Sequence, residues 1–244
     1  MDLRALARKN PSDVIVFRYR SSSRLPELET DRLREPLRRL GFNSDHNGSG
    51  DMIAEFLSFF DRMPARKYQR KEPIYHEGEE IGSVRILQEG AVFVYNHDPF
   101  NNSRTISNIM AAPSILGGEL LNGQEHWINN AQAFTNCQLQ SVKPRELAHI
   151  LQDRPDFAVF LFIAQNISLQ ERDRRIRDFA TNDIDSRMGE ALMTLAKMLP
   201  IPHSITQGFL AEMVGCTRET INKTLNSWER KGIIVWSYKG PELL

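Results

Sequence analysis

The stretch SITQGFLAEMVGCTRETINKTLNSWERK, residues 204–231, contains two short helical patterns separated by a glycine. Ser204 to Gln207 predicts the cap of the first helix, and Thr217 predicts the cap of the second. Between the two helices, Val214-Gly215-Cys216 predicts a tight turn, because glycine takes positive φ without strain. Apolar residues occupy the positions at which such helices face each other: Phe209, Leu210, Val214, Ile221, Leu225 and Trp228. This pattern predicts a helix-turn-helix.

The second helix, expected from Arg218 to about Arg230, begins with side chains suited to the DNA major groove. Arg218 offers two parallel donors to guanine O6 and N7, and Glu219 can accept a hydrogen bond from the cytosine amine. Lys223 would reach a neighbouring base or a phosphate. The hydroxyls of Thr206, Thr217 and Thr220 suit phosphates. The alternative is that Arg218 and Glu219 are ordinary surface charges.

After this pair of helices, residues 232–236 predict a strand and Lys239-Gly240 predicts a turn, as in a short wing. The chain as a whole has 244 residues, 41% hydrophobic and 25% charged, which is typical of a globular protein with a core. No apolar run is long enough to cross a membrane, and the first residues do not resemble a signal peptide. Two cysteines cannot form a disulfide framework or ligate an iron–sulfur cluster, so a cytoplasmic location is expected.

The formal net charge is zero, which at first argues against binding to nucleic acid. The charge is unevenly distributed, however: residues 1–50 carry +3, residues 51–160 carry −4 and residues 203–244 carry +1. The neutral total therefore does not exclude DNA binding. It predicts weak non-specific affinity, with binding that depends on a few well-placed side chains.

The middle of the chain predicts a helix at 52–60 and then short strands with turn signals between them. The strands are expected near 73–79, 84–87, 92–95 and 104–110, with one alternating strand over 131–142. Such spacing over 65–145 is typical of a β-sandwich or jelly roll. Lys143-Pro144 then opens another helix, because proline is tolerated in the first helical turn.

Residues 156–180 contain neither proline nor glycine and predict a helix of about seven turns. Its first half is apolar on several faces, so it needs more than one neighbour to cover it. One stripe repeats at spacings of four and three, and we predict that it forms a dimer interface: Phe160, Ala164, Ile167, Glu171 and Arg174. The alternative is a helix buried against its own domain.

The first fifty residues predict a peripheral extension. A short apolar run at 14–17 suggests a strand, and serines at 21–23 suggest a spacer. Residues 31–40 place Leu33, Leu37 and Leu40 on one helical face, and residues 43–51 resemble a linker. We expect a plain surface helix or ordered tail here, with DNA or partner contact by its arginines as the alternative.

The run Ile205 to Leu225, with Gly215-Cys216-Thr217-Arg218-Glu219-Thr220-Ile221 at its centre, closely resembles the DNA-binding helices of the CRP/FNR family of bacterial transcription regulators. Weaker resemblances lie upstream, and together they extend over roughly 52–240. They are a strand and turn at 75–79, a strand start at 88–92, the start of a phosphate-binding cassette at 117–120, and a hinge at 183–188.

The resemblance implies an α+β fold with a cyclic-nucleotide-binding-like β-roll (jelly roll), a long dimerisation helix and a C-terminal winged helix-turn-helix. The domains expected are an N-terminal extension and linker at 1–50, the β-roll at 51–155, the dimerisation helix at 156–181 and the DNA-binding domain at 182–244. The implied partners are double-stranded DNA, RNA polymerase and a second copy of the chain, with no membrane.

By the same resemblance, Arg218 and Glu219 would read TGTGA-like half-sites arranged as an inverted repeat. Lys223 stands where the family more often has arginine, and lysine lacks the planar fork of arginine. Thr206 and Thr217 would hold phosphates, and Thr220 and Asn222 complete the predicted DNA-binding set.

The sensing site departs from the family. Cyclic-nucleotide binders of this group end the cassette with an Arg-Ser pair that neutralises and bonds the phosphate. The matching window here is His126-Trp127-Ile128-Asn129-Asn130, which has no arginine, and Arg172 and Asp173 stand where the purine would be contacted. We therefore expect no control by cyclic AMP in the usual mode, no cofactor and an unknown effector, for which Glu119, His126 and Arg172 are candidates.

Two other classes of function are alternatives to a DNA-binding regulator. An enzyme is not expected, because the chain has no nucleophile elbow, HExxH, P-loop or paired metal ligands. A ligand-binding or protein-docking module, whose winged helix contacts a protein partner, is the alternative to a DNA-binding regulator. The charged face from Arg218 to Lys223 favours DNA.

Overall fold

A computed structural model describes residues 26–40, 52–98, 103–198, 205–232, 234–237 and 240–243. The features predicted at 14–17, 21–23 and 43–51 lie outside these residues. The chain divides into two compact units. One comprises Pro26–His97 and Ser107–Arg174, and we call it the sensor unit. The described parts of the other lie in Asp98–Ile106 and Arg175–Leu244, and we call it the C-terminal unit.

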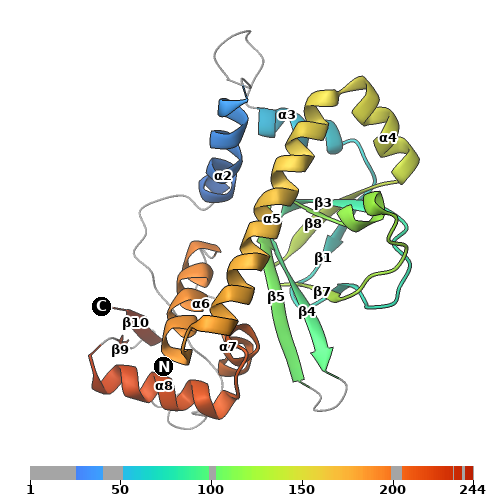
Figure 1. Ribbon diagram of the computed structural model, residues 1–244. Coiled ribbons are helices and arrows are strands. Elements are labelled where there is room, and N and C mark those ends of the chain that lie inside the picture. The colour runs from blue at the N-terminus through green and yellow to red at the C-terminus, as the bar shows by residue number, and fades with distance from the viewer. Residues whose placement is uncertain are drawn as a thin grey trace. The chain divides into compact units, whose positions relative to one another are not determined.

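The sensor unit contains two antiparallel four-stranded sheets (Figure 1). The first sheet has the order β1 (Ala65–Tyr68), β8 (Cys137–Val142), β3 (Val84–Glu89), β6 (Ser114–Leu116). The second has the order β2 (Pro73–Tyr75), β7 (Asn130–Ala133), β4 (Ala91–Asp98), β5 (Ser103–Ala111). Leu87 and Leu139 from the first sheet pack with Val92 and Ala133 from the second in one buried cluster. Two sheets that share one core confirm the predicted jelly roll.

Gly90 marks the point at which the chain passes from one sheet to the other. Its φ is 87°, in the left-handed region, and a Cβ there would overlap the carbonyl of Asn136. Both facts favour glycine. The sequence predicted two strands joined at this glycine, and β3 and β4 confirm them, although they belong to different sheets.

The single strand predicted over 131–142 is wrong. The structure has two strands there, β7 and β8, and they belong to different sheets. Residues 134–136 make the crossing, where the amide of Phe134 donates to the carbonyl of Ala91 at 2.8 Å. The Thr135 hydroxyl accepts from the Ala91 amide at 2.8 Å. Alternation continues across the break in the sequence, so hydrophobic periodicity alone could not reveal it.

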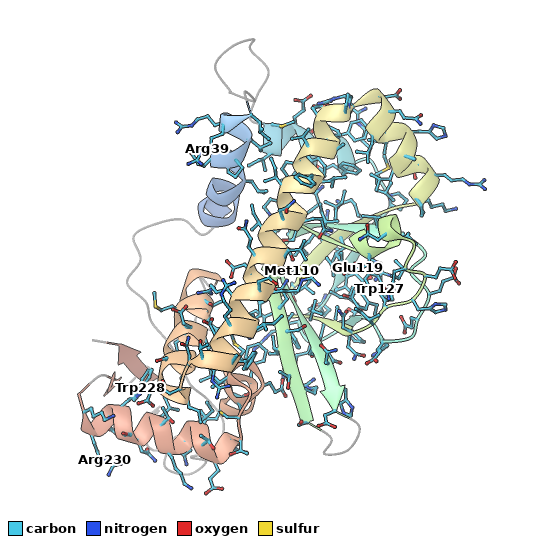
Figure 2. The ribbon with its side chains drawn as sticks, in the orientation of Figure 1. Arg39, Met110, Glu119, Trp127, Trp228 and Arg230 are labelled. Atoms are coloured by element: carbon cyan, nitrogen blue, oxygen red, sulfur yellow. The ribbon has the colours of Figure 1, made fainter. Side chains whose placement is uncertain are left out.

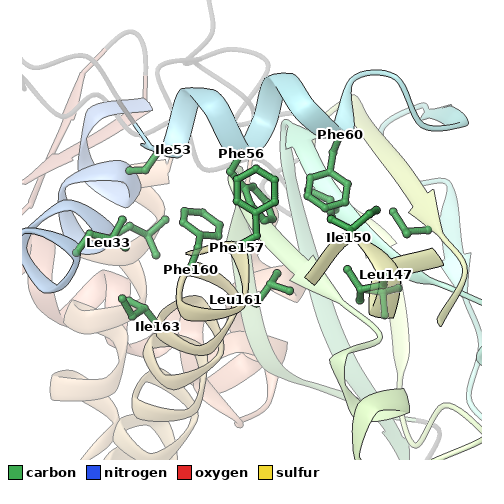
Figure 3. Close-up of a cluster of buried hydrophobic side chains, with 14 residues drawn as sticks. Leu33, Ile53, Phe56, Phe60, Leu147, Ile150, Phe157, Phe160, Leu161 and Ile163 are labelled. Carbon is green, nitrogen blue, oxygen red and sulfur yellow. The ribbon is translucent and has the colours of Figure 1, made fainter. Parts of the chain in front are cut away.

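Four helices cover the outer side of the first sheet with a second core cluster (Figure 3). They are α2 (Pro26–Arg39), α3 (Met52–Phe60), α4 (Pro144–Asp153) and α5 (Pro155–Thr181). Phe56 is fully buried and stacks on Phe160 with ring centroids 4.1 Å apart, and Phe157 meets Phe56 edge-on at 5.2 Å. A fully buried aromatic ring of this kind contributes roughly 1.5–3 kcal/mol to folding.

The predicted surface helix is present as α2, and its apolar face packs into this core while Arg34, Glu35 and Arg38 stay exposed. Leu33 and Leu37 are each 3% exposed and pack in the same cluster as Ile53 of α3 and Ile163 of α5. Two of the three leucines on the predicted apolar face are therefore buried, while the third, Leu40, is 60% exposed. The sequence showed the face but not the surface that covers it.

The C-terminal unit contains α6 (Ile184–Met198), α7 (Gln207–Val214), α8 (Arg218–Arg230) and the strands β9 (Ile234–Ser237) and β10 (Gly240–Leu243). The two strands pair antiparallel, from Gly240 opposite Ser237 to Leu243 opposite Ile234. Helix, turn, helix and hairpin in this order confirm the predicted winged helix-turn-helix (Figure 1). Within the described ranges, no helix combines the length and apolar character needed to span a bilayer.

Candidate nucleic-acid interface and sensing site

The turn between α7 and α8 is fixed by caps and by a close approach. Thr206 accepts a hydrogen bond from the amide of Phe209 at 3.1 Å, and Thr217 accepts one from Thr220 at 3.2 Å. Gly215 has φ 67°, and a Cβ there would lie 2.6 Å from the ring of Phe179. The sequence predicted both caps and the positive φ, and the structure confirms them.

Packing of the two helices decides which side of α8 faces outward. Ile221, Leu225 and Trp228 are each at most 5% exposed and form the inner side of α8. Figure 2 labels Trp228 on this helix. From α7, Leu210 and Val214 are at most 1% exposed, and Phe209 is half-buried. Because the apolar side of α8 is turned inward, its polar side is available to a partner.

The first turns of α8 present the predicted DNA-reading side chains to solvent. Arg218, Glu219, Asn222 and Lys223 are all exposed, and Thr220 is half-buried. Lys223 Nζ lies 2.8 Å from Glu219 Oε1, with both side chains 75% exposed. The hydrogen bond and charge of Lys223 hold the pKa of Glu219 below its ordinary value. An exposed pair of this kind is weak and screened by salt, so DNA contacts can replace it.

The threonine hydroxyls that were predicted to contact phosphates also form hydrogen bonds within the protein. Thr206 and Thr217 cap their helices, and the Thr217 and Thr220 hydroxyl oxygens lie 2.9 Å apart. The structure therefore brings Thr217 and Thr220 together with Arg218, Glu219 and Lys223 in the N-terminal turns of α8. Thr206 lies instead at the start of α7. Such helix starts also present unpaired amides, which favour anions.

In the sensor unit, residues 126–130, where the predicted phosphate ligands are missing, contribute Trp127 to a buried aromatic stack with Tyr75. Trp127, labelled in Figure 2, and Tyr75 are each 4% exposed. Their ring centroids are 3.5 Å apart and their planes are 7° from parallel. The Tyr75 hydroxyl donates to Asn129 Oδ1 at 3.1 Å, and the Arg85 guanidinium lies 5.9 Å from the Trp127 ring. Sequence reasoning missed Tyr75 and Arg85; the tryptophan among polar residues was the available signal.

Two of the three effector candidates act on the same buried group. Burial raises the pKa of Tyr75, the Glu119 carboxylate raises it further, and the cationic side chains of Arg85 and Arg172 lower it. Glu119 and Arg172 therefore share Tyr75 as an electrostatic neighbour. His126 is exposed, and its carbonyl accepts a hydrogen bond from Gln124.

Two glycines of the predicted phosphate-binding cassette, Gly117 and Gly118, pack closely against other side chains of the protein. The short 3-10 helix Gly118–Asn122 follows Gly117, which has φ 83°. A Cβ on Gly117 would lie 3.1 Å from Trp127, and one on Gly118 would overlap the amide of Gln165. The cassette is thus packed with Trp127 and Gln165.

Part of the stripe predicted as a dimer interface on α5 packs against its own chain, and the assignment of these residues to a dimer stays a prediction. Phe160 is 1% exposed in the core, Ala164 and Ile167 pack against the same cluster, and Arg174 pairs with Glu171 at 3.3 Å. The helix has another apolar stripe, which we call the exposed stripe: Phe162 (69% exposed), Leu169 (49%) and Ile176 (66%).

Comparisons with known proteins agree with this arrangement. A model of the Crp-like helix-turn-helix domain matches residues 186–242, and a model of the cyclic nucleotide-binding domain matches residues 65–154. The cAMP-activated global transcriptional regulator CRP of Haemophilus influenzae is 25% identical over 187 residues, covering 72% of this chain and 82% of that protein. The transcriptional regulator LdrP of Thermus thermophilus is 27% identical over 191 residues, covering 73% and 91%.

Solved structures show the same fold. The c-di-GMP-responsive global regulator CLP of Xanthomonas campestris superposes with a TM-score of 0.67 at 18% identity, covering 78% of this chain and 98% of that one. A CRP-family transcriptional regulator of Thermus thermophilus superposes with a TM-score of 0.63 at 22% identity, covering 73% and 91%. Both family models begin after α2, so this helix lies outside the regions they match.

Proposed function

The chain belongs to the CRP/FNR family of transcription regulators, and on this premise we propose that it binds an inverted repeat of TGTGA-like half-sites as a homodimer and contacts RNA polymerase there. The proposal places it in the bacterial cytoplasm and gives it no enzymatic role, in keeping with relatives that are named as transcriptional regulators. The observation that carries it is the exposed set Arg218, Glu219 and Lys223 on α8.

These side chains favour DNA over a protein partner because of their chemistry. Arg218 at the first helical position presents a fork that matches guanine O6 and N7. Glu219 accepts from cytosine, and Lys223 is freed for a base or phosphate when Glu219 turns to the DNA. Thr206 and Thr217 flank this set with hydroxyls and helix-start amides that suit phosphates.

The exposed stripe of α5 supports the homodimer. Phe162, Leu169 and Ile176 recur every seven residues, which is the spacing of a left-handed coiled coil. An interface formed by the same helix of a second copy is self-complementary and closes as a two-fold dimer. A two-fold dimer in turn matches an inverted repeat in DNA.

The aromatic stack supports regulation outside the usual cyclic-AMP mode. The window 126–130 offers no guanidinium to a cyclic phosphate, and Trp127 packs on Tyr75 where the cassette ends. The residues present therefore do not fit the family's phosphate site. Calorimetric titration with cyclic AMP should give no saturable heat, and saturable micromolar binding would overturn this part of the proposal.

The proposed sequence-specific binding to DNA is tested by fluorescence anisotropy with a labelled TGTGA inverted repeat and a scrambled duplex of equal length. Arg218→Ala should lose roughly 1–3 kcal/mol for each half-site, or about 5- to 150-fold, and should relax the preference for G·C at that step. Arg66→Ala is the matched control, because Arg66 is an exposed arginine of the sensor unit. Equal affinity of the Arg218→Ala variant and the wild type would refute direct readout.

A further inference from the structure

Two continuous elements run from the sensor unit into the C-terminal unit, and an arginine on each bonds to α7. The strand β5 (Ser103–Ala111) and the helix α5 (Pro155–Thr181) both cross the boundary between the units. Arg104 lies on β5 and Arg175 lies on α5, and both belong to the C-terminal unit together with α7. The first helix of the helix-turn-helix is thus held from two elements that are far apart in sequence.

Arg104 forms hydrogen bonds to the carboxylate of Glu212, a residue of α7. Its Nε and Nη2 both donate to Oε1 of Glu212, at 3.1 and 2.8 Å. The two side chains are 36% and 20% exposed, so solvent screens this pair less than the open pair on α8. Charge-assisted hydrogen bonds in a partly buried setting are the stronger kind.

Arg175 holds the end of α7 through backbone. Its Nη2 donates to the carbonyl of Met213 at 3.0 Å and to the carbonyl of Ile106 at 3.1 Å. One guanidinium therefore joins β5 to the last turn of α7, where carbonyls lack helical partners. A few residues along α5, Phe179 packs against Gly215 in the turn that follows α7. The contacts define one locus, which we call the clasp: Arg104, Glu212 and Arg175.

We propose that the clasp positions the helix-turn-helix so that the two α8 helices of the homodimer keep a fixed separation. This inference rests on the proposed function. The clasp engages α7 and leaves Arg218, Glu219 and Lys223 of α8 exposed, so it holds the reading helix without masking it. It acts as a positioning device and not as an inhibitory latch.

The physical reason lies in the geometry of an inverted repeat. Two half-sites are read together only when the two α8 helices stand about one turn of DNA apart, roughly 34–36 Å. If the helix-turn-helix were connected to α5 only by the chain between α5 and α6, the distance between the two α8 helices of a dimer would vary. Binding to DNA would then cost the entropy of selecting one distance. Bonds from β5 and α5 to α7 remove that freedom before DNA arrives.

The test is a spacing series. Anisotropy is measured on duplexes in which the centres of two TGTGA-like half-sites lie about 9, 10, 11 or 12 base pairs apart, and on a duplex with one half-site. The wild type should show a sharp preference for one spacing. Arg104→Ala and Glu212→Ala should weaken binding at that spacing by about 5- to 30-fold and flatten the series, with little change on the single half-site.

Two variants separate positioning from folding. The charge exchange Arg104→Glu with Glu212→Arg should restore part of the spacing preference, because the pair is re-formed with its polarity reversed. Arg66→Ala, which removes a different surface ion pair with Glu72, should keep the wild-type profile. Circular dichroism and light scattering establish that every variant is folded and has the oligomeric state of the wild type.

Each outcome bears on one proposal. If the wild type binds none of the duplexes, the proposed function fails. If the wild type binds with a sharp spacing preference and Arg104→Ala keeps the same profile, only the clasp is refuted. Tighter binding by Arg104→Ala would also overturn it, since the contact would then be inhibitory.

Discussion

Substitution of Leu169 by aspartate should separate the proposed homodimer into monomers. Leu169 stands at the centre of the exposed stripe, seven residues from both Phe162 and Ile176, and is 49% exposed in the single chain. About half of the residue is exposed and it lies outside the two buried core clusters, so its replacement should leave the fold intact. In the dimer, by contrast, two copies of the new carboxylate would meet close to the two-fold axis.

The expected loss follows from the exposed area. Full burial of a leucine side chain is worth about 1.5–3 kcal/mol, so burial of the remaining half contributes roughly 0.75–1.5 kcal/mol for each copy. The two copies in a dimer lose roughly 1.5–3 kcal/mol, which raises the dissociation constant about 10- to 150-fold. Desolvation of two facing carboxylates adds several kcal/mol to this figure, so the loss from burial alone is a lower bound.

Sedimentation velocity over a range of concentrations measures the dimer dissociation constant directly. Met193→Asp is the matched control, because Met193 is an apolar helical residue of α6 with 51% exposure that lies off the stripe. Both variants carry the same helix-propensity penalty, about 0.5–0.7 kcal/mol, and should unfold alike. The reasoning is refuted if Leu169→Asp stays dimeric at wild-type concentrations, or if Met193→Asp dissociates the dimer equally well.

Three further outcomes follow from individual contacts. Lys223→Ala should reduce the slope of log affinity against log salt by about one if the lysine meets a phosphate; an unchanged slope with altered base preference would place it on a base instead. Leu37→Ala should lower the free energy of unfolding in urea by about 2–5 kcal/mol, and a loss below about 0.5 kcal/mol would mean that α2 is not part of the core. Hydrogen bonds from Arg154 hold the pKa of Asp156 below its ordinary value, so this carboxylate stabilises the fold above about pH 4 and loses that effect as pH falls through its folded-state pKa. The stability gap between wild type and Asp156→Asn should therefore be constant from pH 5 to pH 7 and shrink below about pH 4, and a gap that persists in acid would contradict the pairing.

The helix-turn-helix could be predicted from sequence because local chemistry determines it. Thr206 and Thr217 cap their helices through bonds that span three residues, and Gly215 takes its positive φ within one turn. Such features depend on neighbours in the chain, so a pattern in one sequence shows them. The inward faces of α7 and α8 follow from helical period in the same way.

The exposed stripe could not be identified from sequence because α5 has apolar residues on more than one side. Phe160 and Phe162 are both large and aromatic, yet one is 1% exposed and the other 69%. Which side meets the sheet depends on α3 and α2, whose places are set by contacts between distant residues. The clasp was hidden for the same reason, since Arg104 and Glu212 are separated by 108 residues.

A neutral chain explains why these long-range features matter for recognition. Non-specific attraction to DNA comes mainly from cations that neutralise phosphates, and residues 203–244 carry a net charge of only +1. A monomer with one reading helix would therefore gain little from electrostatics before it reached its site. Two helices at a fixed separation instead add their base contacts, and preorganisation removes part of the entropy cost of binding. In the proposed homodimer the exposed stripe would provide the second helix and the clasp would fix the separation, so loss of either should cost this protein more affinity than it would cost a strongly basic DNA-binding protein.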